Sequence, residues 1–435
     1  MPNHTWALAS VEIYDGFDHD GANFMLSTFE YEDGFFDRHE REFYGFGKVK
    51  TIQHDTENGD APYRSIVQEF LNRNYYEKGL LKSEMLLDAD DNKFTETINT
   101  FALKDIDTGN TITDPHQRQA DNGIAFPALV KTANLFYEGQ AVAGKRDSMT
   151  YAYDLLGNVT SYTDFGDGGT EDDYTTTIEY HDVDANYIKG VPSSMIVIGD
   201  ASGQLFRKRE TTIDESHGDI TEIRQFLASG EKAVYNMTYD AFGNMTQIIR
   251  PENANNQRLS FDYTYDPEVH TYIIGVEDAY GYSSGATYDF RFGQMLSSTD
   301  LNGQEMRYTI DDIGRVDTIV GPFEIAEGLP FTLTFEYHPE AEVPYALTQH
   351  YDPAHPDNHI ETVTFIDGLG REIQIKKDGA IFTAPEAEDS EEMLVSGTTI
   401  FDAFGRTVEA IYPTKEPKGS ETTINLVNDV ITPTR

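Results

Sequence analysis

The sequence predicts an all-β protein built as a long antiparallel array of hairpins. Three observations lead to this fold class. The tetrad Asp-x-x-Gly occurs eight times between residues 154 and 405, the flanking segments alternate with period two, and no stretch shows sustained helical periodicity. In addition, 26 Tyr and 26 Phe accompany few aliphatic residues, which suits a thin sheet with aromatic faces. We therefore expect under about 10% helix.

Residues 1–130 form an opening segment that differs from the rest of the chain. Its signature, residues 29–49, places seven Phe and Tyr residues beside three glycines, and this composition indicates a corner where strands cross closely. Further strands are predicted at Ser65–Leu71, Leu80–Leu87 and Phe94–Leu103. The polar segment Lys104–Pro127 reads as a long loop or seam.

Residues 131–412 form the hairpin array. The Asp of each tetrad can accept a hydrogen bond from a backbone N–H two residues on, and the Gly allows the positive φ that closes a hairpin with a bulge. We therefore interpret these residues as structural turn formers. The pairs are Asp154 and Gly157, Asp200 and Gly203, Asp240 and Gly243, Asp278 and Gly281, Asp300 and Gly303, Asp311 and Gly314, Asp367 and Gly370, and Asp402 and Gly405.

The C-terminal part of the chain is less regular. A second polar loop is predicted at residues 383–392 (TAPEAEDSEE). Residues 413–435 contain three prolines, so we expect them to be a loose tail or to belong to a continuing chain.

Charge and composition exclude several classes of protein. With 32 Lys and Arg against 76 Asp and Glu, the formal net charge is −44, and nucleic acid or an anionic membrane would be repelled. No apolar run is long enough to cross a bilayer, and no secretory signal is readable at the start. The absence of cysteine excludes disulfides and thiolate chemistry. We interpret the acids as a solvating coat; a lining that acts on a basic cargo is the alternative.

Weak metal candidates lie in the segment HYDPAHPDNH. Imidazole and carboxylate are zinc ligands, but Pro353 and Pro356 prevent the helix that would place two histidines on one face. We therefore favour a solvated hairpin loop and expect no metal. The candidate ligands are His350, Asp352, His355, Asp357 and His359.

Two acidic loops, Asp88–Asn92 and Asp105–Asn110, could hold calcium. The first has Lys93 where an EF-hand needs Gly and Asn99 where it needs Glu, so turns with Asx hydrogen bonds are favoured for both. Paired carboxylates are too abundant to indicate a glycosidase, and no nucleophile or phosphate-loop motif is present. We expect no catalytic residues, no cofactor and no enzymatic activity.

The repeats resemble those of the Rhs/YD-repeat family, in the copies YDLLGNV, YDAFGNM, IDDIGRV, IDGLGRE and FDAFGRT. The aromatic block resembles the stretch that opens the shell region in B components of Tc toxin complexes and in related insecticidal or SpvB-like virulence proteins. The matching residues are Tyr31, Gly34, Asp37, Arg41, Glu42, Phe43, Gly45, Phe46 and Gly47. The two resemblances together cover about residues 25–412.

This resemblance implies a curved strip of YD-repeat hairpins that forms part of a hollow shell. The function it implies is structural: a wall segment of a secreted capsule around a toxic polypeptide, with no chemistry of its own. The implied partners are a C-type Rhs protein with the enclosed toxin polypeptide, and a pore-forming A component reached through flanking domains. Nothing in the sequence reads as the family's propeller or its closing C-terminal motif, so we expect one sector of a shell. A secreted or surface adhesin that binds glycans or proteins is the alternative, and a carbohydrate-active enzyme is more distant.

Overall fold

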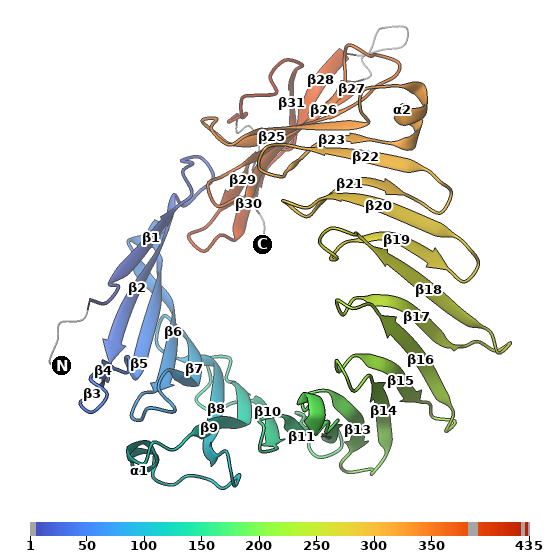
Figure 1. The fold of residues 1–435 in the computed structure, drawn as a ribbon. Helices are drawn as coiled ribbons and strands as arrows, with labels where there is room; N and C mark the ends of the chain where they lie inside the picture. Colours follow the sequence, from blue (N-terminus) through green and yellow to red (C-terminus); the bar gives the residue numbers. More distant parts are fainter. Residues whose placement is uncertain (1–5, 382–389, 428–430, 434–435) are drawn as a thin grey trace. The chain divides into compact units, whose positions relative to one another are not determined.

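The structure, a computed structural model, describes residues 6–381, 390–427 and 431–433. Strands account for 54% and helices for 4%, and 27 strands belong to one long antiparallel sheet (Figure 1). The predicted all-β hairpin sheet with little helix is therefore confirmed. The chain divides into unit 1 (Met1–Val11, Ser27–His54 and Ala61–Ser260) and unit 2 (Glu12–Leu26, Asp55–Asp60 and Phe261–Arg435).

Unit 1 contains most of the opening segment and the first part of the array, and the ends of β1, β2, β5 and β18 extend into unit 2. Its elements are β1 (Ser10–Tyr14), β2 (Phe24–Glu32), β3 (Phe36–Asp37), β4 (Glu42–Phe43), β5 (Lys48–Asp55), β6 (Ala61–Leu71), β7 (Leu80–Asp88), β8 (Lys93–Asp105), α1 (Pro115–Ala120), β9 (Ala125–Phe136), β10 (Lys145–Tyr153), β11 (Val159–Phe165), β12 (Tyr174–Tyr180), η2 (Asp184–Asn186), β13 (Pro192–Gly199), β14 (Leu205–Ile213), β15 (Ile220–Phe226), β16 (Lys232–Tyr239), β17 (Met245–Glu252) and β18 (Arg258–Tyr265).

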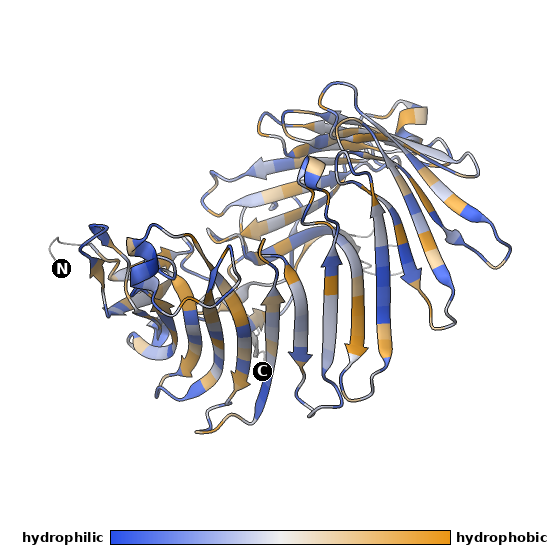
Figure 2. Ribbon diagram, turned by 60° about the horizontal axis from the view of Figure 1, so that its bottom comes forward, coloured by the Kyte–Doolittle hydropathy of each residue, from blue (hydrophilic) through white to orange (hydrophobic). Residues whose placement is uncertain are grey.

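The strands of unit 1 follow the chain in a simple order. From β6 to β17, each strand pairs antiparallel with the next. The register shifts between Thr238 and Tyr239, just before a turn, which is the bulge that a Gly-containing hairpin turn produces. Hydrophobic and hydrophilic residues alternate along many strands (Figure 2), so each strand presents different side chains to the two faces of the sheet.

Unit 2 continues the array and adds a small second sheet. Its elements are η1 (Thr56–Asn58), β19 (Ile273–Asp278), β20 (Ser283–Asp289), β21 (Gln294–Thr299), β22 (Glu305–Ile310), β23 (Val316–Val320), α2 (Pro322–Glu327), β24 (Leu333–His338), β25 (Tyr345–His350), β26 (Ile360–Ile366), β27 (Glu372–Ile381), β28 (Ser390–Val395), β29 (Thr399–Phe401), β30 (Thr407–Ile411), β31 (Thr414–Pro417) and β32 (Ile431–Pro433). Strands β29, β30 and β32 form the small sheet.

The main hydrophobic core lies in unit 2. Phe17 and Phe401 pack with residues of β25, β26 and β27, namely Tyr345, Val363, Phe365 and Ile373. The large side chains that are fully buried in the described residues lie almost entirely in this unit, and Thr176 is the exception from unit 1. Unit 1 is therefore close to a single layer of sheet, whereas the C-terminal part of unit 2 has material packed on the sheet.

Two segments differ from the sequence expectations. The predicted loop Lys104–Pro127 contains α1, whose N-cap Asp114 accepts a hydrogen bond from the Gln117 backbone N–H at 2.9 Å. Six residues are too few to show helical periodicity, although Asp followed by Pro is a helix-start signal. After Tyr412, β31 pairs with β28, so residues 414–417 are not a loose tail. Most of the polar loop predicted at residues 383–392 lies outside the described residues.

Candidate functional site: repeat turns and a buried carboxylate cluster

Seven of the eight predicted tetrads lie in hairpin turns that share one design. At Asp240, the carboxylate Oδ1 accepts hydrogen bonds from the backbone N–H groups of Phe242 (2.8 Å) and Asn244 (3.0 Å). Gly243 has φ +84°, a conformation that is strained for any residue with a Cβ. The same two bonds, to the second and fourth residues on, occur at Asp154, Asp278, Asp300, Asp311, Asp367 and Asp402, and all eight tetrad glycines have positive φ.

The tetrad at Asp200 has a different turn. Here the Gly203 N–H donates to the carbonyl of Gly199 at 2.8 Å, and the Gly199 N–H donates to the carbonyl of Gln204. The Asp200 carboxylate instead accepts from the Thr175 hydroxyl at 3.1 Å. The turn is thus one residue longer and starts at Gly199, so Asp200 does not hold the capping position that the sequence predicts.

Two further turns have the tetrad design without its glycine. Asp88 caps the N–H groups of Asp90 and Asn92, with Asp91 at φ +62° in place of Gly. Asn253 caps Asn255 and Gln257 in the same way, with Asn256 at φ +56°. Asn and Asp tolerate this conformation better than other residues with a Cβ. An Asx residue followed three positions later by Asn or Asp was therefore the available signal for these turns.

In the two loops considered for calcium, the first Asp accepts hydrogen bonds from its own loop, and Asp105 also pairs with Arg118 at 2.9 Å. Hydrogen bonds from the Asn92 side chain and from backbone N–H groups lower the pKa of Asp88. In the second loop, Asp105 Oδ1 accepts from the N–H groups of Asp107 (3.0 Å) and Thr108 (2.9 Å), and the Thr108 bond is the main cause of its lowered pKa. Both loops are Asx turns in the structure.

Tyrosines that precede the turns form hydrogen bonds to the backbone of the neighbouring strand. The Tyr153 hydroxyl donates to the carbonyl of Leu129 at 2.8 Å, and the Tyr239 hydroxyl donates to that of Ile220 at 2.9 Å. Burial raises the pKa of both hydroxyls. The aromatic residue of the repeat thus packs across strands and satisfies its polar end.

The histidine-rich segment does not assemble into a metal-binding cluster among the described residues. His355 Nδ1 lies 2.7 Å from Asp352 Oδ2 at the surface, and this hydrogen bond lowers the pKa of Asp352. His359 instead packs against the rings of Phe331 and Tyr351, and His350 is exposed.

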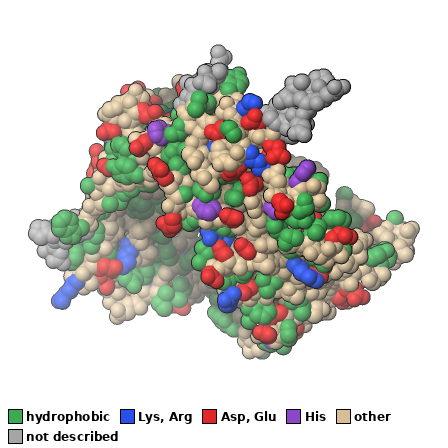
Figure 3. Space-filling view, turned by 90° about the horizontal axis from the view of Figure 1, so that it is seen from above, with side chains coloured by type: hydrophobic (Ala, Val, Ile, Leu, Met, Phe, Trp, Pro, Cys, Tyr) green, Lys and Arg blue, Asp and Glu red, His purple; other side chains and the backbone are tan. Residues whose placement is uncertain are grey.

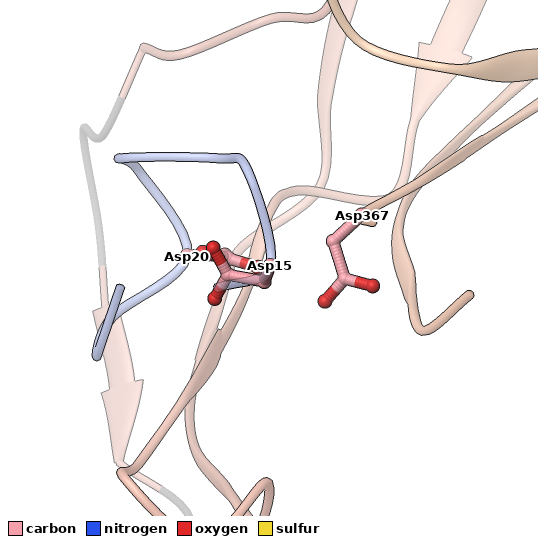
Figure 4. Close-up of side chains that lie close together, drawn as sticks. All are labelled: Asp15, Asp20 and Asp367. Atoms are coloured by element: carbon pink, nitrogen blue, oxygen red, sulfur yellow. The ribbon is translucent and has the colours of Figure 1, made fainter. Parts of the chain in front are cut away.

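A cluster of buried charges that sequence reasoning missed lies in unit 2. Asp15 and Asp20 extend from the loop between β1 and β2, and they lie together opposite Asp367, which starts the β26–β27 turn (Figure 4). Carboxylate oxygens of all three lie within 4.8 Å of one another. Arg371 bonds each of them: its Nη2 donates to Asp15 (3.0 Å) and Asp20 (3.4 Å), and its Nε donates to Asp367.

Backbone contacts fix this cluster. The Gly368 N–H donates to the carbonyl of Asp15, and the Phe401 N–H donates to that of Asp20 at 2.6 Å. A Cβ at Gly21 would lie 1.9 Å from the Phe401 carbonyl oxygen, so only glycine fits there. The loop between β1 and β2 is thereby fastened to the turn at Asp367 and to β29.

The charges of the cluster do not balance. Arg371 supplies one positive charge against three carboxylates, and its guanidinium also lies 4.1 Å from the ring centroid of Phe401. Burial, together with the neighbouring Asp15 carboxylate, raises the pKa of Asp20 to about 7. Asp20 Oδ1 has no hydrogen-bond partner among the described residues. Arg371 is thus the counter-ion that stabilises the three buried carboxylates, and Asp20 is the carboxylate whose ionised form is stabilised least.

On the face drawn in Figure 3, the acidic side chains are spread over the surface and do not gather in one patch. In the described part of the chain, no helix is long and apolar enough to cross a membrane.

Comparisons with known proteins agree with the resemblance found in the sequence. Residues 8–79 match the family model of the insecticide toxin TcdB middle/N-terminal region. This range includes the aromatic signature at residues 29–49. A search of the curated proteins finds no significant match.

Solved structures match most of the chain. The crystal structure of TcdB2-TccC3 aligns with a TM-score of 0.68 and 15% identity, over 90% of this chain and 28% of that chain. The crystal structure of TcdB2-TccC3-Cdc42 aligns with a TM-score of 0.66 and 14% identity, over 90% of this chain and 30% of that chain. The structure of the Photorhabdus luminescens Tc holotoxin pore, with a TccC3 variant, aligns with a TM-score of 0.66 and 13% identity, over 90% of this chain and 30% of that chain. The chain thus spans less than a third of the length of each of these three chains, and the predicted resemblance to the shell region of Tc toxin B components is confirmed.

Proposed function

We propose that this chain is a wall segment of a toxin-encapsulating shell of the Tc toxin B-component type. The observation that carries the proposal is the fold match to TcdB2-TccC3, which extends over 90% of the chain. The sequence match at residues 8–79 supports the same assignment independently of the array. In this proposal residues 1–130 open the wall segment, residues 131–412 form its hairpins, and the Asp and Gly residues of the tetrads shape its turns.

The physical properties of the chain suit a wall. A sheet one layer thick encloses more volume per residue than a packed domain does, and each hairpin covers the edge of its neighbour, which removes sites for aggregation. The excess of acids keeps such a sheet soluble. The wall acts by steric exclusion, without catalysis and without a cofactor.

The partners follow from the same assignment. A C-type Rhs protein would complete the shell around a toxin polypeptide, and a pore-forming A component would dock through flanking domains. The matched structures of TcdB2-TccC3 and of a Tc holotoxin pore support these two kinds of association. A protein of this kind acts outside the cell that makes it, so we propose that it is secreted.

Limited proteolysis of the cargo tests the wall role. The chain would be produced with its natural flanking segments and its C-type partner, and the digestion rate of the cargo would be compared with that in a complex lacking residues 25–412. We expect intact cargo in the first complex and rapid digestion in the second. Electron microscopy of both complexes would show whether the deletion opens the particle or prevents its assembly. Equal protection of the cargo in both complexes would contradict the wall role and favour the adhesin alternative.

A further inference from the structure

A lysine amine is completely buried where the segment after β31 covers β27. The Lys376 side chain is 0% exposed, which is rare for lysine. Its Nζ donates to Glu416 Oε2 at 2.5 Å, to the Ser420 carbonyl oxygen at 2.8 Å and to the Thr423 carbonyl oxygen. The ring centroid of Phe365 lies 5.8 Å away. The amine is therefore held in a site that excludes solvent.

The same carboxylate also binds a side-chain amide. Glu416 Oε1 accepts a hydrogen bond from Asn425 Nδ2 at 2.5 Å, so the two oxygens of one carboxylate hold the lysine amine and the asparagine amide side by side. Asn425 Oδ1 accepts from the Val427 N–H at 2.8 Å, which fixes the orientation of the amide and polarises its C=O bond.

A buried glutamine fixes the backbone of Asn425. Gln374, two residues before Lys376 on β27 and therefore on the same face, donates from Nε2 to the Asn425 carbonyl at 2.8 Å. Its Oε1 accepts the Asn425 N–H, also at 2.8 Å. Gln374 is 1% exposed and Asn425 is 9% exposed. The reacting groups are thus held in place, and such positioning accelerates reactions between neighbouring groups.

The geometry points to an intramolecular amide bond between Lys376 and Asn425, formed with Glu416 as proton carrier. Lys376 Nζ first passes a proton to Glu416, and the neutral amine attacks Cγ of Asn425. The C–Nδ2 bond of the tetrahedral intermediate then breaks, and Nδ2 leaves as ammonia with the proton from Glu416. Glu416 takes up the second proton, which the former lysine nitrogen loses as it becomes the amide N–H. One amide replaces another, no oxidant or cofactor is needed, and the chain loses one molecule of ammonia.

Such a bond would close a covalent loop from residue 376 to residue 425 and fasten the segment after β31 to the sheet. Cross-links stabilise chiefly by restricting the unfolded chain. This self-modification happens once in each molecule, and it is independent of whether the chain serves as a shell wall.

Intact-mass spectrometry of the purified chain tests the bond, with tandem spectrometry of its peptides. We expect a mass lower than that of the sequence by one ammonia, and a branched peptide that joins Lys376 to Asn425. Lys376→Met and Glu416→Gln should restore the full mass. Lys415→Met is the matched control, because Lys415 lies on β31, is largely exposed and pairs with Glu392; it should keep the deficit.

Three results would overturn the inference. The first is a wild-type chain with the full sequence mass and a β-type circular dichroism spectrum. The second is an ammonia deficit that persists in Lys376→Met, because it would indicate a succinimide at Asn425. The third is a loss of water with a branched peptide at Glu416. Since the wild-type mass and the branched peptide together are decisive, the test holds even where a variant does not fold.

Discussion

The turns at Asp240 in unit 1 and at Asp367 in unit 2 have the same backbone design in different surroundings. Both carboxylates accept two backbone hydrogen bonds through Oδ1, and both turns contain a glycine with positive φ. Asp240 is half-buried at the end of a single-layered hairpin, whereas Asp367 is 2% exposed. The residue after the glycine is Asn244 in the first turn and Arg371 in the second.

This difference shows how one local motif serves two purposes. At Asp240 the turn reverses the chain, and the Asn244 side chain donates back to Asp240 Oδ2 at 3.1 Å. In unit 2, Arg371 extends from the turn to the loop between β1 and β2 and joins segments that are 356 residues apart. Turn closure is thus encoded locally, and attachment is added by one side chain at the fifth position.

The largest effect is expected when Arg371 is replaced by Met. Three buried carboxylates would lose their counter-ion, and breaking a buried ion pair in this way costs about 3–5 kcal/mol. Arg315→Met is the matched control, because Arg315 occupies the same position in its turn and bonds Asp311. Arg315 is partly exposed, so we expect its replacement to lower the unfolding free energy by only about 0–1 kcal/mol. Urea unfolding of both variants measures the difference. Equal losses would mean that the cluster does not hold unit 2 together.

The Asp20 carboxyl should make stability depend on pH. Its pKa of about 7 in the folded state lies above the ordinary 3.8, so the folded chain retains a proton that the unfolded chain has lost. The unfolding free energy should therefore decrease as the pH rises from about 4 to about 7, by about 1.4 kcal/mol per pH unit at most, and then level off.

Asp20→Asn should remove this dependence. The Asn amide can keep its oxygen toward Arg371 and place Nδ2 where Oδ1 lacks a partner, so the variant should be more stable than the wild type at pH values above about 7. Denaturation at several pH values compares the two. Parallel pH profiles would contradict the assignment of the raised pKa to Asp20.

Gly21→Ala should weaken the attachment of the loop between β1 and β2. The new Cβ would collide with the Phe401 carbonyl oxygen. Gly16 lies in the same loop and has φ +78°, and a Cβ added there would meet nothing within 4 Å, so Gly16→Ala carries the backbone strain without the collision. We expect Gly21→Ala to lower the unfolding free energy by about 1–3 kcal/mol more than Gly16→Ala does. Equal melting temperatures would show that the loop is not tightly seated.

The smallest effect is expected for Tyr239→Phe, which removes the hydrogen bond to the Ile220 carbonyl. The loss should be about 0.5–1.5 kcal/mol. Tyr280→Phe, at an exposed position, should change the unfolding free energy by under about 0.5 kcal/mol. An unchanged unfolding free energy in Tyr239→Phe would mean that the tyrosine acts through packing alone.

The sequence was sufficient to predict what is local in this fold. Asp and Gly at a fixed spacing predict a hairpin turn because the hydrogen bonds and the positive φ involve neighbouring residues. Asp200 shows the limit, because one additional residue shifts the cap and the sequence pattern does not reveal it. The Arg371 cluster was missed for another reason: its partners meet only after the chain has folded. Arg at the fifth position of three tetrads, Arg315, Arg371 and Arg406, was the one signal present.

The central claim, that this chain is part of a shell wall, is tested most directly by cryo-electron microscopy of the protein with its flanking segments and its C-type partner. We expect a closed particle in which residues 25–412 form part of the wall, with cargo density on its inner side. A particle that is closed without these residues, with the hairpin array projecting from its exterior, would contradict the account.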